Sequence, residues 1–117
     1  MSTLKIHVGD SLETIGERVK DAVRRDKRGE RLREYHLTFD SFETLAKVLT
    51  PRRLELLRYV HKHPAASIRA LAQALDRDYR RVYDDVEALA EAGLLERAAK
   101  GTGVSAPFDV IETRVAL

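Results

Sequence analysis

The chain has 117 residues, of which 44% are hydrophobic, and its formal net charge is +2. This length predicts one compact domain, or one domain with a small appendage, that buries roughly two-thirds of the surface its unfolded chain exposes. With this small net charge, the composition indicates an acidic partner far less than the composition of a histone-like protein would. Any nucleic-acid interface must therefore be argued from where the charges lie.

The sequence contains no cysteine, which excludes a disulfide framework and thiolate metal sites and is typical of a reducing compartment. No apolar run reaches the roughly 20 residues of a membrane span. The first residues, MSTLKIHVGD, lack the basic and then apolar layout of a signal peptide. We therefore expect a cytoplasmic protein that does not bind membranes.

Residues 1–40 have the pattern of a strand, a helix and a second strand. Apolar and polar residues alternate in LKIHV (4–8) and again in YHLTF (35–39), which is the period of half-buried strands. Between them we expect a helix capped by Asp10 or Ser11. The apolar face of this helix consists of Leu12, Ile15, Val19, Ala22 and Val23.

The next segments are helical. DSFETLAKVL (40–49) predicts a helix with a capping-box-like pair of Asp40 and Glu43. A second helix starts at Thr50 as N-cap, with Pro51 in its first turn, and is stopped by Pro64. Its expected inward residues are Leu54, Leu57 and Val60.

Two further helices and a hairpin complete the pattern. A helix starts at Ser67, a short turn spans 76–78, and the last helix ends at Gly93. Residues 94–110 then read as a strand, a glycine-flanked turn and another strand. The expected core residues of the two helices are Ile68, Leu71, Ala72 and Leu75, followed by Val82, Val86 and Leu89.

This order of elements predicts a mainly α protein with a small β part. The fold would be a winged helix-turn-helix over residues 41–117 that binds DNA. It is preceded by a strand-helix-strand extension over residues 1–40, which would serve dimerisation or partner binding.

A helix-turn-helix presents its second helix to the major groove of DNA. With Val82 and Val86 facing inward, the polar residues at the front of the last helix remain outside. Arginine can bond guanine in a bidentate manner, tyrosine can reach a phosphate, and aspartate can accept from cytosine. The alternative is a solvated face held by the (i, i+4) pairs Arg80–Asp84 and Arg81–Asp85.

The segments LTFDSFETLAKVLT, LTPRRLELLRYV and SIRALAQALDRDYRRVYDDVEALAEAGLLER resemble small prokaryotic winged helix-turn-helix transcriptional regulators. These regulators are MarR/ArsR-like, and some resemble antitoxins of toxin-antitoxin pairs. Asp76 departs from the glycine common in the turn. Asp84 departs from the basic or neutral residue usual at its position, which weakens phosphate contact and is compatible with base readout.

The expected partner is double-stranded DNA, and the expected function is that of a sequence-specific transcriptional regulator, with repression preferred. The alternative is an antitoxin that binds a cognate toxin protein and regulates its own operon. The expected DNA-contacting residues are Ser67, Arg69, Tyr79, Arg80, Arg81, Tyr83, Asp84, Arg97 and Lys100.

Other chemistry is not supported by the pattern. His61 and His63 are two residues apart and would not share a helix face as metal ligands. KGTG (100–103) does not open a helix, so a phosphate-cradling loop is not expected. No nucleophile-base set or carboxylate pair has a structural context. We therefore expect no enzyme activity, cofactor or metal, and we interpret the basic run 24–33 as a solvated helix end.

We also expect a homodimer held partly by residues 1–40, because the apolar residues of this block need a partner. The run IETRVAL (111–117) alternates as well. It predicts a strand added to the same sheet, either within one chain or between two chains.

Overall fold

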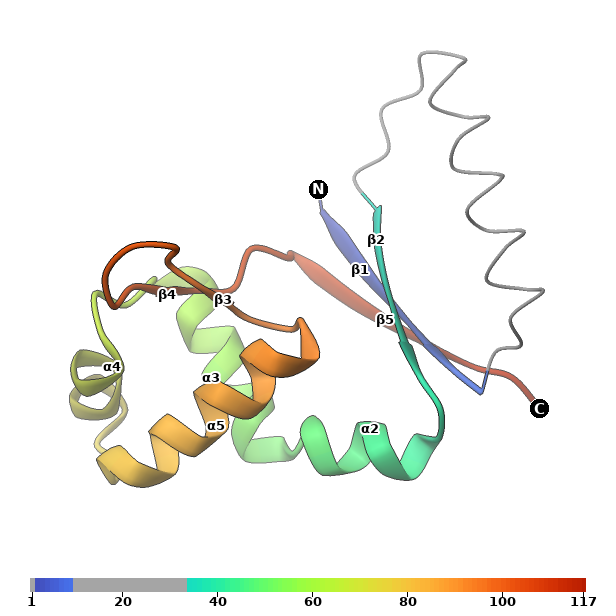
Figure 1. Ribbon diagram of the computed structural model, residues 1–117, viewed down its shortest axis with the longest axis horizontal. Coiled ribbons are helices and arrows are strands. Elements are labelled where there is room, and N and C mark those ends of the chain that lie inside the picture. The colour runs from blue at the N-terminus through green and yellow to red at the C-terminus, as the bar shows by residue number, and fades with distance from the viewer. Residues whose placement is uncertain (1, 10–33) are drawn as a thin grey trace, which may run out of the picture. The chain divides into compact units, whose positions relative to one another are not determined.

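The computed structural model describes residues 2–9 and 34–117 (Figure 1). It separates into two compact units. The first, here called the sheet unit, contains residues 1–45 and 108–117, and the second, the helical unit, contains residues 46–107. The protein is a mixed α/β structure rather than a mainly α one, because the C-terminal segment joins the N-terminal strands in a sheet.

The sheet unit is built on a three-stranded parallel sheet with the order β2-β1-β5 (Figure 1). The central strand β1 (Thr3–Val8) pairs with β2 (Glu34–Phe39) on one side and with β5 (Val110–Val115) on the other. The strands predicted at 4–8 and 35–39 are confirmed, each one residue longer. The strand predicted in IETRVAL is also confirmed, and it pairs within one chain.

The register gives the sheet one apolar and one polar face. Leu4, Ile6 and Val8 are almost fully buried. Because neighbours in a parallel sheet share a face, β2 and β5 contribute to the same side as these residues. Those neighbours are Tyr35, Leu37 and Phe39, and Ile111, Thr113 and Val115.

The polar face contains two contacts that the sequence did not indicate. His7 is buried, and its Nε2 lies 2.8 Å from Nδ1 of His36, with the two rings stacked. Lys5 Nζ lies 3.3 Å from Glu34 Oε1 on the same face. Both contacts join β1 to β2, so they fix the register of this strand pair.

The predicted helix with Asp10 or Ser11 as its cap and the basic run 24–33 lie outside the described residues. The first described helix, α2 (Phe42–Val48), is capped differently from the prediction. Ser41 Oγ accepts a hydrogen bond from the Thr44 backbone N–H at 3.2 Å. The capping residue is therefore Ser41, which stands three residues before Thr44, and not Asp40 paired with Glu43.

The helical unit contains α3 (Pro51–Lys62), α4 (Ile68–Leu75) and α5 (Tyr79–Ala92). Thr50 and Ser67 cap α3 and α4 as predicted, each accepting from the backbone N–H three residues later. Asp78 caps α5 in the same way, and Gly93 ends α5 in the left-handed conformation with φ 89°. These caps satisfy backbone groups that helix ends leave unpaired.

The core of the helical unit agrees largely with the apolar pattern. All three predicted core residues of α5 are fully buried, and in α4 only Leu75 is half-exposed. In α3 the predicted Leu54 is half-exposed, and Leu56 is fully buried instead. Leu56 and Val60 are four residues apart and share a face, so the buried stripe of α3 is rotated from the one predicted.

The predicted hairpin is confirmed and follows the helices. It pairs β3 (Glu96–Arg97) antiparallel with β4 (Val104–Ser105). The N–H and C=O groups of Ala65 and Val104 exchange two hydrogen bonds of 2.9 Å, which adds a third short segment beside β4. Thr102 Oγ1 donates to the Ala66 carbonyl at 2.7 Å, so the turn of the hairpin is fixed to the start of α4. No helix of the described residues is long and apolar enough to cross a membrane.

The turn after α4 offers a test of backbone conformation. Asp76 is the one described non-glycine residue with positive φ, at 51°. A β-branched residue fits this left-handed conformation poorly. We expect Asp76→Val to lower the free energy of unfolding by about 1–2 kcal/mol, measured by urea denaturation. Asp76→Gly and Asp76→Asn should leave stability equal or higher, and a loss in all three variants would contradict a conformational cause.

Candidate functional site

The candidate site is the helix pair α4–α5 with its connecting turn. The turn holds three residues, 76–78, between the two helices. Backbone hydrogen bonds close it: Asp76 N–H donates to the Gln73 carbonyl at 3.2 Å, and Arg77 N–H donates to the Ala72 carbonyl at 3.0 Å. Because these bonds satisfy the last carbonyls of α4, the chain leaves α4 and enters α5 in one defined direction.

A half-buried charge network, here called the Asp85 network, holds α5 against the rest of the helical unit. Asp85 Oδ1 accepts from Arg53 Nε at 3.0 Å, and Asp85 Oδ2 accepts from Arg77 Nη2 at 2.7 Å. The three side chains are 15–19% exposed. Such charge-assisted hydrogen bonds are stronger than neutral ones, especially where solvent screening is reduced.

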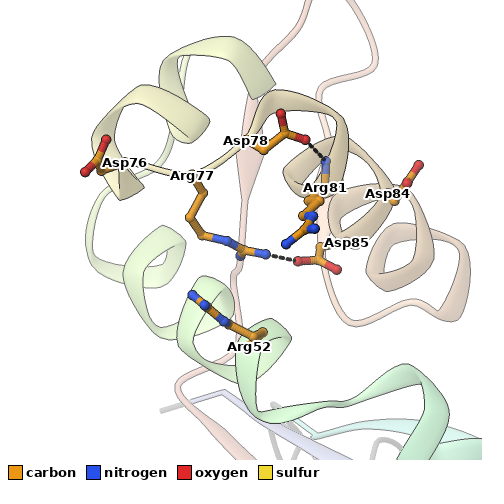
Figure 2. Close-up of a pocket in the computed structure, with 7 residues that line it drawn as sticks. All are labelled: Arg52, Asp76, Arg77, Asp78, Arg81, Asp84 and Asp85. Carbon is orange, nitrogen blue, oxygen red and sulfur yellow. Dashed lines mark hydrogen bonds and ion pairs between the residues drawn. The ribbon is translucent and has the colours of Figure 1, made fainter.

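The same network reaches the end of α2. Arg53 Nη1 donates to the carbonyls of Lys47 and Val48, both at 3.0 Å. One arginine of α3 therefore satisfies two terminal carbonyls of α2 and one carboxylate oxygen of α5. Arg77 brings the α4–α5 turn to the same carboxylate, as Figure 2 shows. The network therefore joins α3, the turn and α5 at one point.

The outer side of the α4–α5 pair carries a row of two tyrosines with an arginine at each end, here called the arginine–tyrosine ridge: Arg69, Tyr79, Tyr83 and Arg80. Arg69 of α4 places its guanidinium 4.8 Å from the centre of the Tyr79 ring. Arg80 lies 5.4 Å from the centre of the Tyr83 ring, and the two tyrosine rings are 6.2 Å apart. Cation–π contacts hold guanidinium groups in defined orientations while leaving their N–H donors accessible.

A pocket of about 490 Å³ opens beside the start of α5. Figure 2 shows the residues that line it, with Asp76 and Asp84 pointing away from its centre. Its lining carries four carboxylates and three guanidinium groups, so the pocket is not a strongly basic surface. The residues concerned are Arg52, Asp76, Arg77, Asp78, Arg81, Asp84 and Asp85.

The carboxylates of this pocket have different roles. Asp85 is neutralised by two arginines, and Asp78 caps α5 through the Arg81 N–H at 3.2 Å. Asp84 Oδ1 lies 3.5 Å from Arg80 Nε, in a pair whose side chains are 56% and 76% exposed. Two of the four carboxylates are therefore engaged in holding the fold, and the exposed Asp84 is available to a partner.

The structure brings five of the predicted site residues together. Arg69 of α4 and the front of α5 form one exposed surface, and the α5 residues concerned are Tyr79, Arg80, Tyr83 and Asp84. Arg81 is exposed on the neighbouring side of α5. Among the described residues its guanidinium forms no ion pair. The predicted pair of Arg81 with Asp85 is wrong, because Asp85 turns inward to Arg53 and Arg77.

The other predicted site residues lie apart from this surface or are otherwise engaged. Ser67 Oγ accepts from the Ala70 backbone N–H at 3.0 Å, so its side chain serves as a helix cap. Arg97 forms an ion pair with Glu87 of α5, which holds β3 beside that helix. Lys100 is exposed in the turn between β3 and β4.

Sequence reasoning did not identify Arg53 and Arg77 as part of the site. Arg53 and Asp85 are separated by 32 positions in the chain, so no local spacing rule connects them. Gln73 was also missed. It lines a second shallow pocket beside the arginine–tyrosine ridge, together with Arg69 and Tyr79. A four-residue spacing from Arg69 to Gln73 on α4 was the available signal.

A protein-family model described as HVO_A0114 matches residues 48–113 of the chain. The match covers more than half of the 117 residues and includes α3, α4, α5 and the hairpin. No curated protein and no solved structure matches the chain.

The Asp85 network predicts different consequences for two adjacent aspartates. Asp85→Ala leaves Arg53 and Arg77 half-buried without their carboxylate, and we expect it to lower the free energy of unfolding by about 2–3 kcal/mol. Asp84→Ala removes only an exposed pair and should change stability by less than about 0.5 kcal/mol. Urea denaturation of both variants measures the difference, and equal losses would contradict the anchoring role of Asp85.

Proposed function

This chain belongs to the HVO_A0114 family, and we propose that the part of it covered by the family match is the DNA-binding module of a transcriptional regulator. In this proposal α3, α4 and α5 form a helix-turn-helix, α5 is the recognition helix, and the β3–β4 hairpin is the wing. The preferred outcome of binding is sequence-specific repression. Within the match, the proposal concerns the residues that lie in the helical unit, 48–107.

One observation carries the proposal. In the first two turns of α5, Tyr79, Arg80 and Arg81 are exposed and Tyr83 is half-exposed, while Val82 and Val86 are fully buried. A recognition helix needs this division, because its N-terminal residues must reach base edges while its inner face is fixed. The three-residue turn and the Asp85 network supply the fixed placement of α5 within the helical unit.

The arginine–tyrosine ridge has the chemistry that DNA recognition requires. Arg80 is held over Tyr83 and beside Asp84, so its guanidinium is oriented before binding. A guanidinium can donate two hydrogen bonds to guanine O6 and N7. Arg69 and Tyr79 extend the same surface onto α4, where arginine and a phenol hydroxyl can contact phosphates.

The aspartates on this surface favour base readout over bulk attraction to phosphate. Asp84 is exposed at the front of α5, and a carboxylate can accept a hydrogen bond from the amino group of cytosine. The same carboxylate repels phosphate, so binding would depend on sequence more than on charge. The net charge of +2 agrees with this view.

The hairpin supplies the second proposed contact. Thr102 is bonded to Ala66, which directly precedes the N-cap of α4, so the turn is held near the start of that helix. Lys100 is exposed in this turn. A lysine at a wing tip can neutralise one phosphate without reading a base.

Selection of binding sites from random double-stranded DNA with the full-length protein tests the proposal directly. The expected result is an enriched sequence motif that the protein binds more tightly than unrelated DNA of equal length. Failure to enrich any motif, together with no binding at low salt, would contradict the proposed function.

The guanidinium groups at the front of α5 should determine specificity. We expect Arg80→Ala or Arg81→Ala to weaken binding to the selected DNA by about 1–3 kcal/mol and to relax the preference at one base position. Fluorescence anisotropy at several salt concentrations measures both effects. Arg58→Ala, which removes an exposed arginine of α3, is the control, and unchanged binding in the Arg80/Arg81 double variant would rule out α5 as the recognition helix.

The hairpin contact should behave differently. We expect Lys100→Glu to lower affinity for all DNA sequences to a similar degree and to reduce the dependence of affinity on salt, because it removes a phosphate contact. Lys100→Gln should have a smaller effect in the same direction. Repeating the site selection with Lys100→Glu is the decisive measurement, since a changed motif would mean that the hairpin reads bases.

A further inference from the structure

Strand β5 forms one edge of the described sheet (Figure 1). The side chains of β5 are exposed from Glu112 to its end, and Val115 is 45% exposed although it is apolar. An edge strand presents a row of backbone N–H and C=O groups that can pair with another strand.

The hydrogen bonds of β5 show which of its backbone groups face outward. Val110 N–H donates to the Ser2 carbonyl at 3.3 Å, and Ala116 N–H donates to the Val8 carbonyl at 3.0 Å. Successive residues of a strand direct these groups to opposite sides. The even-numbered residues of β5 therefore face β1, and Ile111, Thr113 and Val115 direct their N–H and C=O groups to the outer edge.

The sequence of this edge is complementary to itself in the antiparallel direction. If a second β5 is placed around a two-fold axis at Thr113, Thr113 lies opposite Thr113 of the second copy. Ile111 then lies opposite Val115, and Glu112 lies opposite Arg114, each twice by symmetry. In this register the outward N–H and C=O groups of Ile111, Thr113 and Val115 all meet partners.

The side chains fit the same register. Glu112 and Arg114 are exposed and form no ion pair with any described residue, so both are available to a second copy. Opposite charges directly across an antiparallel pair stabilise it, and like charges destabilise it. On the other face of the sheet, Ile111 and Val115 would extend the apolar surface that Leu4, Ile6 and Val8 begin.

The other edge strand does not have this property. Glu34 is the only carboxylate in β2, and β2 contains no lysine or arginine. Two antiparallel copies of β2 would therefore bring no opposite charges together. Glu34 is also already engaged by Lys5 of β1 at 3.3 Å.

We propose that two copies of this chain pair antiparallel along β5 around a two-fold axis at Thr113, which makes one six-stranded sheet from two three-stranded ones. The occupant of the edge is a second copy of this chain. The assembly carries two helical units, one from each copy. The pairing does not depend on the proposed DNA binding, and its tests contain no DNA.

Charge reversal tests the pairing through its symmetry. Sedimentation velocity on the full-length protein across the micromolar range should show a dimer. E112R and R114E each place like charges opposite one another in the homodimer, and each should dimerise about tenfold more weakly. The double variant E112R/R114E restores opposite charges and should dimerise like the unchanged protein.

An equimolar mixture of E112R and R114E gives the most specific test of the pairing. Each strand then faces opposite charges at positions 112 and 114 of its partner, so a heterodimer should form at a concentration at which each variant alone is mostly monomeric. Simple loss of folding cannot produce this result. A monomeric unchanged protein, or single variants that dimerise as well as the unchanged protein, would overturn the proposal.

A cross-link tests the register independently of charge. The chain has no cysteine, so T113C introduces a single thiol. In the proposed pairing the two Cα atoms at position 113 are about 5.5 Å apart, within the range of a disulfide. Mild oxidation should therefore convert T113C into covalent dimers.

V115C is the matched control on the same strand and the same face. In the proposed register, position 115 lies opposite Ile111 of the second copy. The two cysteines at position 115 are then separated by about four residues along the strand, which is too far for a disulfide. T113C should cross-link at least about tenfold faster than V115C, because only the two thiols at position 113 lie within the distance range of a disulfide. Equal rates, or faster reaction of V115C, would overturn the proposed register.

Discussion

The carboxylate of Asp85 is the point on which the arrangement of the helical unit depends. It accepts hydrogen bonds from Arg53 of α3 and Arg77 of the α4–α5 turn, and Arg53 also binds the last carbonyls of α2. A half-buried carboxylate is stable only with such partners. The network therefore fixes the start of α5 in a position that apolar packing alone would leave less defined.

This placement explains how α5 can contribute both to the core of the helical unit and to the exposed surface proposed to contact DNA. Val82, Val86 and Leu89 fill the core, and Asp85 beside them is turned inward by its two arginines. The exposed face of α5 then retains Tyr79, Arg80 and Tyr83 together with Asp84, held by cation–π and ion-pair contacts. The proposed DNA contacts of α5 thus rest on side chains that lie outside the buried core.

The sheet unit follows a different physical rule. Its central strand β1 is paired on both sides, so its apolar residues are buried and its backbone is satisfied. The outer strands leave edges, and of these β5 alone has an outward sequence that matches its own reverse. Parallel pairing within the chain and antiparallel pairing between chains would use opposite sides of the same strand.

The sequence by itself determined most of the helices and their core faces. Thr50, Ser67 and Gly93 mark helix ends, and the apolar spacing places Val82, Val86 and Leu89 in the core. Both signals are local, because caps and periodicity act over a few residues. It also indicated that residues 111–117 form a strand, but not which strand they join. Only the tertiary structure decided the β2-β1-β5 order, the contact of His7 with His36, and the choice of Arg53 and Arg77 over Arg81 as partners of Asp85. These contacts join residues far apart in the chain, and no local pattern specifies them, since they form only when separate elements pack together.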